Sequence, residues 1–423
     1  MTGRTFARYD AYKDSGERWL GEIPAEWEVV RNKEIFEERS TRSLTGEEML
    51  LTVSHITGVT PRSEKNVNMF MAETLEGYKL CHKGDLLVNT MWAWMGALGT
   101  SRYEGICSPS YNVYKPRKGI PYYHRYFDYL YRTPNAVVEM TRNSKGIVSS
   151  RLRLYPTEFF QIRTILPDSK TQRAIAAYLD ARTATLDRQI ALLTQKAARY
   201  AGLKQALINH TVTHGLDPAA PMRDSGIEWI GEIPAHWIDR RHKDNFILVI
   251  DRCNDTTLEK VGLENIESKT GRFIHTGSTF EGDGICFKVN DILFGKLRPY
   301  LAKVYLAEFN GSAVGDIFVY RPKSNMLPRF AQYLMLSTRY IGVMNGSTIG
   351  AKMPRVSSSF IANLPVMTPP LPEQHAIAAY LDAQTAHINR IIETIDAKIA
   401  ALQELRQTLI NDVVTGKIKV CDA

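Results

Sequence analysis

Two stretches of the chain carry apolar residues at the three- and four-residue spacing of one helix face. The stretch 374–411 contains no glycine or proline, and 172–209 is interrupted only by Gly202. At a rise of about 1.5 Å per residue, either helix would be about 57 Å long. A narrow apolar seam of that length is typical of a helix that pairs with another helix. The seam positions are Ile175, Leu179, Leu186, Ile190, Leu193, Tyr200, Leu203 and Leu207 in the first stretch and Ile377, Leu381, Ile388, Ile391, Ile395, Leu402, Leu405 and Leu409 in the second.

The two stretches belong to a duplication. Residues 14–27 and 224–237 share ten of fourteen positions at an offset of 210, and 172–184 and 374–386 share eleven of thirteen at an offset of 202. A period of about 200 residues indicates two copies of a whole domain. We therefore predict that the two long helices pair with each other. The pattern leaves open whether they run antiparallel, with the copies at opposite ends, or parallel; a core helix of an ordinary domain is the alternative.

The segments between the repeats, 28–170 and 238–372, are barely alike in sequence but share a rhythm of short strands, turns and a helix. This rhythm predicts an α+β fold used twice. The expected strands are 49–56, 85–89 and 111–115 in the first copy and 260–266, 291–294 and 316–320 in the second, with helices at 122–131 and 329–337. The predicted boundaries are 1–167 and 214–370 for the globular domains and 168–213 and 371–420 for the helices.

Composition narrows the class of protein only modestly. There are 53 basic and 45 acidic residues, a net charge of +8 and a pI near 9.1, which is compatible with nucleic acid but does not demand it. The five cysteines lie at least 26 residues apart with no C-x-x-C pair, so we expect reduced core thiols. With no signal peptide and no apolar run long enough to cross a bilayer, we expect a soluble, cytoplasmic protein.

The sequence contains none of the motifs that carry common catalytic chemistry. There is no G-x-x-x-x-G-K-[ST] loop and no H-E-x-x-H, and the ten histidines form no ligand-spaced cluster. We therefore expect no catalytic residue, no metal site and no cofactor bound by this chain.

Three motifs resemble a known family. They are Glu-Gln-His-Ala-Ile-Ala-Ala-Tyr-Leu-Asp at 373–382, repeated from Gln172 to Asp180, Gly-Asp-Leu-Leu-Val-Asn-Thr-Met at 84–91, and Lys-Leu-Arg-Pro-Tyr-Leu at 296–301. Together with the double repeat, they resemble the specificity subunit of type I restriction-modification enzymes over essentially the whole chain. One copy departs from the pattern, with Thr171 where the other has Glu373.

The resemblance implies two target-recognition domains joined by two long antiparallel helices in a pseudo-two-fold repeat, each domain reading one half of a bipartite, asymmetric DNA site. A helix pair of about 57 Å would exceed one ~34 Å turn of DNA. It also implies prokaryotic partners: two modification subunits with S-adenosylmethionine, and two restriction subunits with ATP and Mg²⁺. The chain itself would not be an enzyme. The alternatives are a scaffold built on a coiled coil that does not bind DNA and, from another class, an enzyme fused to its own reader.

Candidate DNA contacts lie in two basic Gly- and Ser-containing loops and in two turns that follow a strand. Side chains of these kinds bind phosphates or base edges, and Trp92 and Trp94 could stack or form core. The predicted DNA-binding residues are Asn89, Arg142, Lys145, Arg151 and Arg153 in the first copy and Lys296, Arg298, Tyr300, Lys352 and Arg355 in the second.

Tyr178 and Asp180 recur as Tyr380 and Asp382 at the two helix starts. Two interpretations stay open: a repeated joint between domain and helix, or a docking site for the modification subunit. We carry all four as candidate partner-binding residues.

Overall fold

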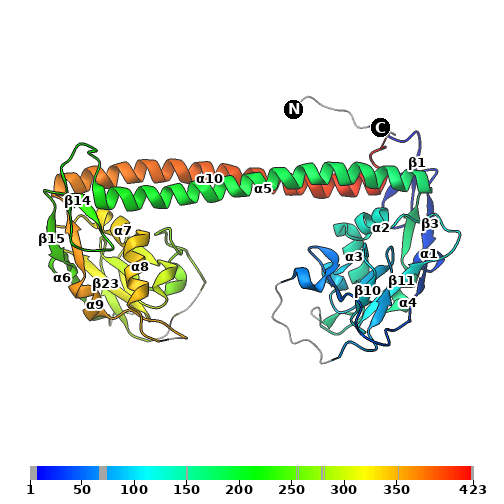
Figure 1. Cartoon of the computed structure of the whole chain (residues 1–423), viewed down its shortest axis with the longest axis horizontal. Coiled ribbons are helices and arrows are strands. Elements are labelled where there is room, and N and C mark those ends of the chain that lie inside the picture. Colours follow the sequence, from blue (N-terminus) through cyan, green and yellow to red (C-terminus); the bar gives the residue numbers. More distant parts are fainter. Residues whose placement is uncertain are drawn as a thin grey trace. The chain divides into compact units, whose positions relative to one another are not determined.

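The structure is a computed structural model that describes residues 7–65, 74–148, 151–253, 255, 257–277, 280, 282–350 and 352–420 of the 423-residue chain. The chain divides into two compact units (Figure 1). Unit 1 comprises Met1–Leu192 with Lys398–Ala423, and unit 2 comprises Leu193–Ala397. The domain boundaries drawn from the repeats stay a prediction, since the units divide both long helices.

Unit 1 contains a globular α+β part, called head 1 (residues 7–166). Its four-stranded sheet has the order β4-β11-β8-β9, and the apolar faces of α2, α3 and α4 contribute to the core beside it. The strands are β1 Tyr12–Asp14, β2 Glu22–Pro24, β3 Glu28–Arg31, β4 Phe36–Glu38, β5 Leu51–Ser54, β6 Gly58–Pro61, β7 Lys79–Cys81, β8 Leu86–Asn89, β9 Leu98–Thr100, β10 Gly105–Cys107, β11 Tyr111–Pro116 and β12 Arg163–Leu166. The helices are α1 Asn32–Ile35, α2 His124–Tyr131, α3 Pro134–Arg142 and α4 Pro156–Gln161, with 3₁₀ turns η1 Arg62–Glu64 and η2 Ala93–Met95.

Unit 2 contains head 2 (residues 222–368), with a four-stranded sheet of the matching order β16-β23-β20-β21. The strands are β13 Met222–Asp224, β14 Glu232–Pro234, β15 Ile238–Arg241, β16 Phe246–Val249, β17 Arg252–Cys253, β18 Glu259–Val261, β19 Gly284–Phe287, β20 Ile292–Gly295, β21 Val304–Leu306, β22 Gly311–Ala313, β23 Ile317–Pro322 and β24 Pro365–Thr368. The helices are α6 His242–Asn245, α7 Pro328–Leu336, α8 Thr338–Gly346 and α9 Ser358–Asn363, with 3₁₀ turns η4 Leu263–Asn265 and η5 Pro299–Leu301.

The strand registers show that the two heads share one frame. In head 1 Asn89 pairs with Tyr111 and in head 2 Gly295 pairs with Ile317, both shifted by 206 residues. The offset is 210 at α1 and α6, 204 at α2 and α7, and 202 at α4 and α9. The heads therefore differ in loop length, at a few connections, while the sheet they share keeps its register. The predicted repeat of one α+β fold is confirmed.

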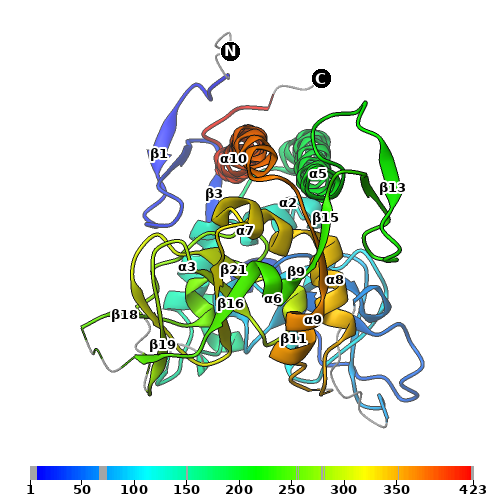
Figure 2. The same cartoon turned by 90° about the vertical axis from the view of Figure 1, so that its left-hand side faces the viewer.

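The long helices are α5 (Ser169–His214) and α10 (Leu371–Val414), and each begins in one unit and ends in the other. In each unit the first half of one helix lies beside the second half of the other, so they run antiparallel, and Figure 2 views the pair end-on. Ile208 and Val212 of α5 belong to the core of head 2, and Leu409 and Val413 of α10 to that of head 1. The predicted pairing is confirmed, with the antiparallel direction that the resemblance implied.

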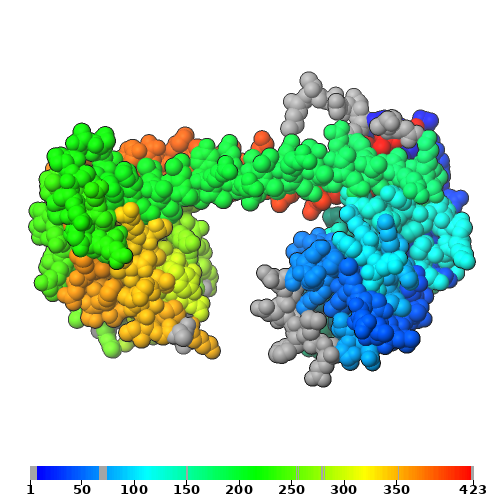
Figure 3. Space-filling view, in the orientation of Figure 1, coloured from blue at the N-terminus to red at the C-terminus, as the bar shows by residue number. Residues whose placement is uncertain are grey.

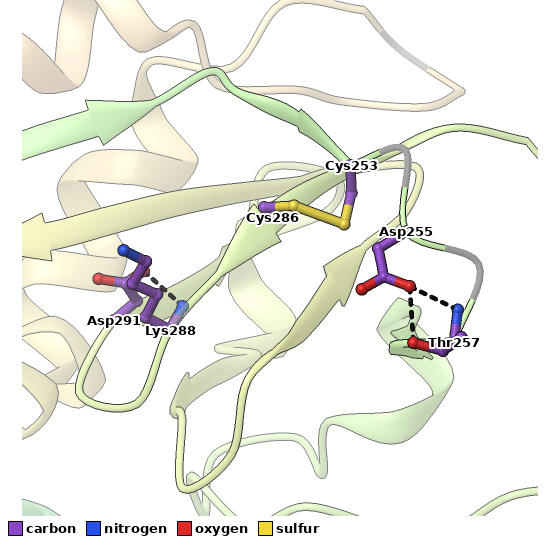
Figure 4. Close-up of a disulfide and its surroundings, with 6 residues drawn as sticks. All are labelled: Cys253, Asp255, Thr257, Cys286, Lys288 and Asp291. Atoms are coloured by element: carbon purple, nitrogen blue, oxygen red, sulfur yellow. Dashed lines mark hydrogen bonds between the residues drawn. A yellow bond between two sulfur atoms is a disulfide. The ribbon is translucent and has the colours of Figure 1, made fainter.

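Two sequence-based predictions were wrong. The strand expected at 260–266 ends at Val261, because Leu263–Asn265 form a 3₁₀ turn in which the Asn265 side chain accepts from the Gly262 amide at 3.0 Å. The cysteines are not all reduced, since Cys253 on β17 and Cys286 on β19 form a disulfide (Figure 4). These strands are antiparallel neighbours, so the fold brings together two thiols that are 33 residues apart in sequence. Cys81 and Cys107 are free and buried, and Cys421 lies outside the described residues.

Candidate nucleic-acid interface

The basic loop of head 1 is a closed hairpin-like turn. The backbones of Lys145 and Arg153 exchange two hydrogen bonds, of 2.9 and 2.8 Å, and close the loop at its base. The amide of Leu154 then donates to the carbonyl of Thr90 at 3.2 Å, which fixes the loop against the turn that follows β8. Two of the sequence-predicted regions are thus brought to one edge of head 1.

The cations of this edge differ in how far their charge is neutralised. Arg142 donates to Glu139 at 3.1 Å, and Lys145 pairs with Glu158, whose pKa its hydrogen bond lowers. Arg151 and Arg153 are exposed and have no ion-pair partner among the described residues. Arg151 and Arg153 are therefore the cations of this loop with charge available to an external anion.

Head 2 closes its shorter loop in the same way. The backbones of Ile349 and Arg355 exchange hydrogen bonds of 3.0 and 3.1 Å, and the amide of Val356 donates to the carbonyl of Lys296 at 3.1 Å. The latter bond is the counterpart of the one from Leu154 to Thr90, at offsets of 202 and 206. The predicted residues of head 2 also converge on one edge.

One carboxylate contacts two of the predicted cations of head 2. Arg355 donates to Asp316 through Nε and Nη2 at 3.0 and 2.9 Å, and Nζ of Lys296 lies 3.8 Å from the same carboxylate. The hydrogen bonds from Arg355 lower the pKa of Asp316, so the carboxylate stays charged. Arg298 and Lys352 are exposed and have no ion-pair partner among the described residues, and Tyr300 is 47% exposed.

Asn89 is the least exposed of the predicted DNA-binding residues. Its side chain is buried at the end of β8, and its Oδ1 accepts from the amide of Met91 at 3.3 Å. Its side chain therefore holds the turn that follows. The indole of Trp92 is 49% exposed and stacks on Trp94, with ring centroids 6.1 Å apart.

The repeated residues at the helix starts form a joint in both units. In unit 1 the carboxylate of Asp180 accepts from Arg125 and, at 2.7 Å, from Tyr129. In unit 2 Asp382 accepts from Arg329 and Tyr333 at 2.7 and 2.6 Å. Both aspartates thus attach a head to its long helix. These arginines and tyrosines escaped the sequence analysis, although they recur in α2 and α7 at an offset of 204.

The tyrosines of the same motif are placed differently. Tyr380 is 38% exposed, and the ring of Tyr178 lies under the guanidinium of Arg182, with the carbon 5.5 Å from the centroid. Leu192 and Leu203 of α5 are exposed, and Figure 3 shows α5, in green, at the surface. Tyr178 and Tyr380 keep their place as candidate partner-binding residues.

A second repeated contact, also missed, centres on a buried glutamine at each helix start. In unit 2 Nε2 of Gln374 donates to the carbonyls of Asn325 and Pro369 at 2.9 and 2.8 Å, and Oε1 accepts from the amide of Leu327 at 2.7 Å. Gln172 makes the equivalent three bonds, to Pro121, Pro167 and Tyr123. The sequence signal for this contact was available, because the glutamine is identical in both copies of the repeated motif.

Among the described residues, no group of three or more His, Cys, Asp or Glu side chains could hold a metal ion. None of the helices searched among them is long and apolar enough to cross a membrane.

A cleft of about 660 Å³ in unit 1 and one of about 690 Å³ in unit 2 lie at the aspartate joints. The edges that carry the unpaired cations are thus the best candidates for contact with a polyanion.

Comparison with known proteins finds matches to part of the sequence of this chain. Residues 256–401 match the family model of the type I restriction modification DNA specificity domain. The type I restriction enzyme EcoDI specificity subunit of Escherichia coli is 27% identical over 159 residues, which cover 36% of this chain and 35% of that protein. The MjaVIII specificity subunit of Methanocaldococcus jannaschii is 23% identical over 283 residues, 62% of this chain and 63% of that protein. The matched region thus spans about a third of the first relative.

Two solved structures share the fold of nearly the whole chain. A chain from a structure reported on complex assembly and conformational transition of the type I R-M system superposes with a TM-score of 0.69, at 14% identity, and covers 94% of this chain and 99% of that one. The HsdS subunit from Thermoanaerobacter tengcongensis gives a TM-score of 0.51 at 15% identity, over 94% and 98% of the two chains. Residues 256–401 thus match a type I restriction modification DNA specificity domain, and nearly the whole chain shares the fold of the two solved chains.

Proposed function

We propose that this chain is the non-catalytic DNA-sequence-specificity subunit of a type I restriction-modification enzyme. Each head reads one half of a bipartite, asymmetric DNA site, and α5 and α10 set the spacing between the halves. The helices also dock two modification subunits, and two restriction subunits complete the enzyme. S-adenosylmethionine, ATP and Mg²⁺ bind to those partners, which carry out the chemistry.

One observation carries this proposal: the two heads repeat a frame in register, while the loops and turns that the frame holds carry different residues. The loop of head 1 carries Arg142, Lys145, Arg151 and Arg153, whereas the loop of head 2 carries Lys352 and Arg355, of which only Arg355 matches an arginine of the first loop. A protein that binds two copies of one ligand has no need for such divergence. Two different half-sites on DNA require it, because base edges are distinguished by the side chains that meet them.

Methylome sequencing of the host, with and without the gene, tests the proposal directly. We expect a split adenine-methylated motif that disappears with the gene. An unchanged methylome would contradict the proposal. Co-purification supplies a second criterion, since a scaffold unrelated to restriction would fail to retain the modification subunits.

The unpaired cations allow a sharper test of DNA contact in the assembled methyltransferase complex. The double variant Arg151→Glu/Arg153→Glu should weaken binding to every duplex and reduce the log-log salt slope by roughly 0.9 for each lost phosphate contact. Arg142→Gln is the matched control, because the charge of Arg142 is already paired with the carboxylate of Glu139. An unchanged affinity and an unchanged salt slope in the double variant would show that this loop does not bind phosphate.

The docking role assigned to Tyr178 and Tyr380 is tested by retention of the modification subunits. Tyr380→Ala should reduce the amount that co-purifies, with head 2 still folded. Tyr333→Phe is the control, because it removes a bond of the joint without changing the exposed helix side. Undiminished retention in Tyr380→Ala would leave the tyrosine with a structural role only.

A further inference from the structure

The turn after β8 in head 1 and the turn after β20 in head 2 share a set of backbone hydrogen bonds. Their backbones differ at one position, where Trp92 has a φ of −127° and Arg298 a φ of +49°. The amide of Asn89 donates to the carbonyl of Ala97 at 3.0 Å, and that of Gly295 to Lys303 at 2.9 Å. The bond from Met95 to Trp92, at 3.0 Å, reappears as the bond from Leu301 to Arg298, at 2.9 Å. Each pair differs by 206 residues, so the turns can be compared position by position.

The comparison shows a change of chemistry at positions that correspond between the two turns. Trp92 corresponds to Arg298, and Trp94 corresponds to Tyr300. All four precede or belong to a 3₁₀ turn, η2 or η5, whose first residue (Ala93 or Pro299) is buried in the head. The buried positions of the turn hold it to the frame, and the exposed ones have diverged.

In head 1 the exposed residue at this position, Trp92, belongs to a pair of stacked indoles that is already ordered. Nε1 of Trp94 donates to the carbonyl of Met91 at 3.0 Å, and the carbonyl of Trp94 accepts from the hydroxyl of Thr141 at 3.2 Å. Trp94 is therefore fixed to its own turn and to α3, and it supports the ring of Trp92, which is stacked on it at an interplanar angle of 16°. An indole held in this way presents a rigid apolar face with little conformational entropy left to lose on binding.

In head 2 the same position carries a free cation. Lys296 and Arg355, its neighbours at this edge, both pair with Asp316, whereas Arg298 is exposed and has no ion-pair partner among the described residues. The amide of Arg298 donates to the carbonyl of Pro354 at 2.8 Å, and its φ is +49°, an uncommon value for a residue with a side chain. The basic loop thus holds the residue in a conformation it seldom adopts.

We propose that this one position, Trp92 in head 1 and Arg298 in head 2, is the specificity-determining residue of each head. Arg298 recognises a guanine in its half-site, because a guanidinium can donate two parallel hydrogen bonds to O6 and N7. Trp92 recognises its half-site by apolar contact, with a thymine methyl or the face of an unstacked base. The two heads therefore read DNA by different chemistry from one turn. The inference rests on the proposed function.

The test measures binding of the methyltransferase complex to a pool of duplexes in which both half-sites are randomised. Arg298→Ala should lower the preference for guanine at one position of one half-site by roughly 10- to 100-fold. Trp92→Ala should relax one position of the other half-site only, and Trp92→Phe should retain most of that preference. Neither change should alter the half-site of the other head.

Lys352→Ala is the matched control, since Lys352 is an exposed, unpaired cation on the loop of the same edge. It should weaken all sequences equally and lower the salt slope by roughly 0.9. Arg298→Lys keeps the positive charge but cannot donate two parallel hydrogen bonds, so it should also lose the preference for guanine. This variant replaces Arg298→Ala if the alanine variant does not fold. If Arg298→Ala instead behaves like Lys352→Ala, Arg298 is a phosphate contact and the inference is wrong. Absence of any split motif for the unmodified chain would contradict the proposed function itself.

Discussion

Arg406 on α10 forms a bidentate ion pair with Asp187 on α5, with Nε–Oδ1 and Nη2–Oδ2 distances of 2.8 and 3.4 Å. The equivalent residues of unit 2, at an offset of 202, are Asn389 and Lys204, and Nζ of Lys204 donates to Oδ1 of Asn389 at 3.0 Å. The same cross-helix contact is therefore ionic in one unit and a bond from a cation to a neutral amide in the other. The duplication has kept the position of the contact and changed its charge.

This difference predicts a difference in salt dependence. Both side chains of the Asp187–Arg406 pair are partly exposed, so a double-mutant cycle to alanine should give a coupling energy of only about 0.2–1 kcal/mol, decreasing as salt is added. The cycle for Lys204 and Asn389 is the control, and its coupling should change less with salt because Asn389 is uncharged. Urea unfolding at low and high salt measures both. A salt-independent Asp187–Arg406 coupling would contradict the ionic assignment.

The buried glutamines predict a much larger effect at the helix starts. Gln374→Ala removes three hydrogen bonds and leaves the carbonyls of Asn325 and Pro369 and the amide of Leu327 without their partner. Each buried polar group left unsatisfied costs about 1–3 kcal/mol. We expect unit 2 to lose at least about 3 kcal/mol of unfolding free energy, measured by urea titration.

Gln374→Glu separates hydrogen bonding from shape at this position. The carboxylate has the same size but faces two carbonyl oxygens with no donor, so it should destabilise unit 2 nearly as much as alanine does at neutral pH. A well-tolerated glutamate would mean that packing, rather than the pair of donated bonds, holds the helix start.

Much of the architecture could be predicted because the sequence contains an internal duplication. The repeated motifs predicted the duplicated frame, and unbroken apolar spacing over 374–411 predicted a long helix. The repeat also contained the joints, since Arg125 and Tyr129 recur as Arg329 and Tyr333, although only their helix partners Asp180 and Asp382 were singled out.

The state of each candidate cation could not be predicted in the same way. Asp316 pairs with Arg355 across 39 residues and with Lys296 across 20. The pairing of β20 with β23 brings Asp316 to Lys296, and a bridge between Leu297 and Arg355 brings Arg355 to the same place. The loop 142–153 contains no acid, yet Glu139 and Glu158 on either side of it pair with Arg142 and Lys145. The charge of a loop therefore depends on the residues that pack around its base.

A departure from the repeat predicts a stabilising substitution. Trp237 Nε1 lies 3.1 Å from both carboxylate oxygens of Glu373, but the equivalent Trp27 Nε1 is buried with no acceptor among the described residues, where Thr171 replaces the glutamate. Thr171→Glu should supply that acceptor, which is worth about 1 kcal/mol. It also removes the hydrogen bond from Thr171 Oγ1 to Asp168 and places a second carboxylate beside it, so Thr171→Gln should stabilise unit 1 more. Thr171→Gln is the control for charge. A thermal midpoint unchanged or lowered in both would show that the side chain cannot reach Trp27.

The disulfide predicts that the thiols differ in reactivity. In the unfolded chain without reductant, alkylation should label Cys81 and Cys107 but leave a linked Cys253–Cys286 peptide, seen by mass spectrometry. In the folded chain Cys81 should also resist labelling, because burial raises the pKa of its thiol to about 12. Cys253→Ser should lower the unfolding free energy of head 2 by about 3–4 kcal/mol if loop entropy dominates. A reduced pair in the purified chain would contradict the assignment.

A buried histidine predicts how the stability of head 2 depends on pH. The His242 ring stacks on Phe246 and contacts Tyr320, with centroids 4.3 and 4.7 Å apart, and its Nε2 has no partner among the described residues. Burial lowers the pKa of His242 to about 3, whereas an unfolded histidine has a pKa near 6.5. The folded state therefore binds fewer protons, so this stability is fully present above pH ~6.5 and is lost as the pH falls toward 3.

At pH 5 the loss should reach about 2 kcal/mol, since each pH unit below the unfolded pKa contributes about 1.4 kcal/mol. His242→Asn tests the cause, because head 1 has Asn32 at the equivalent position, with its amide donating to Phe159 at 3.1 Å and its Oδ1 accepting from Tyr131 at 2.6 Å. The variant cannot titrate, so its unfolding free energy should fall less than that of the unmodified chain between pH 7.5 and 5, whatever its absolute stability. Urea titrations of both chains at both pH values give the two changes in unfolding free energy that are to be compared. Equal pH dependence in both chains would mean that His242 is already protonated, or solvated, in the folded head.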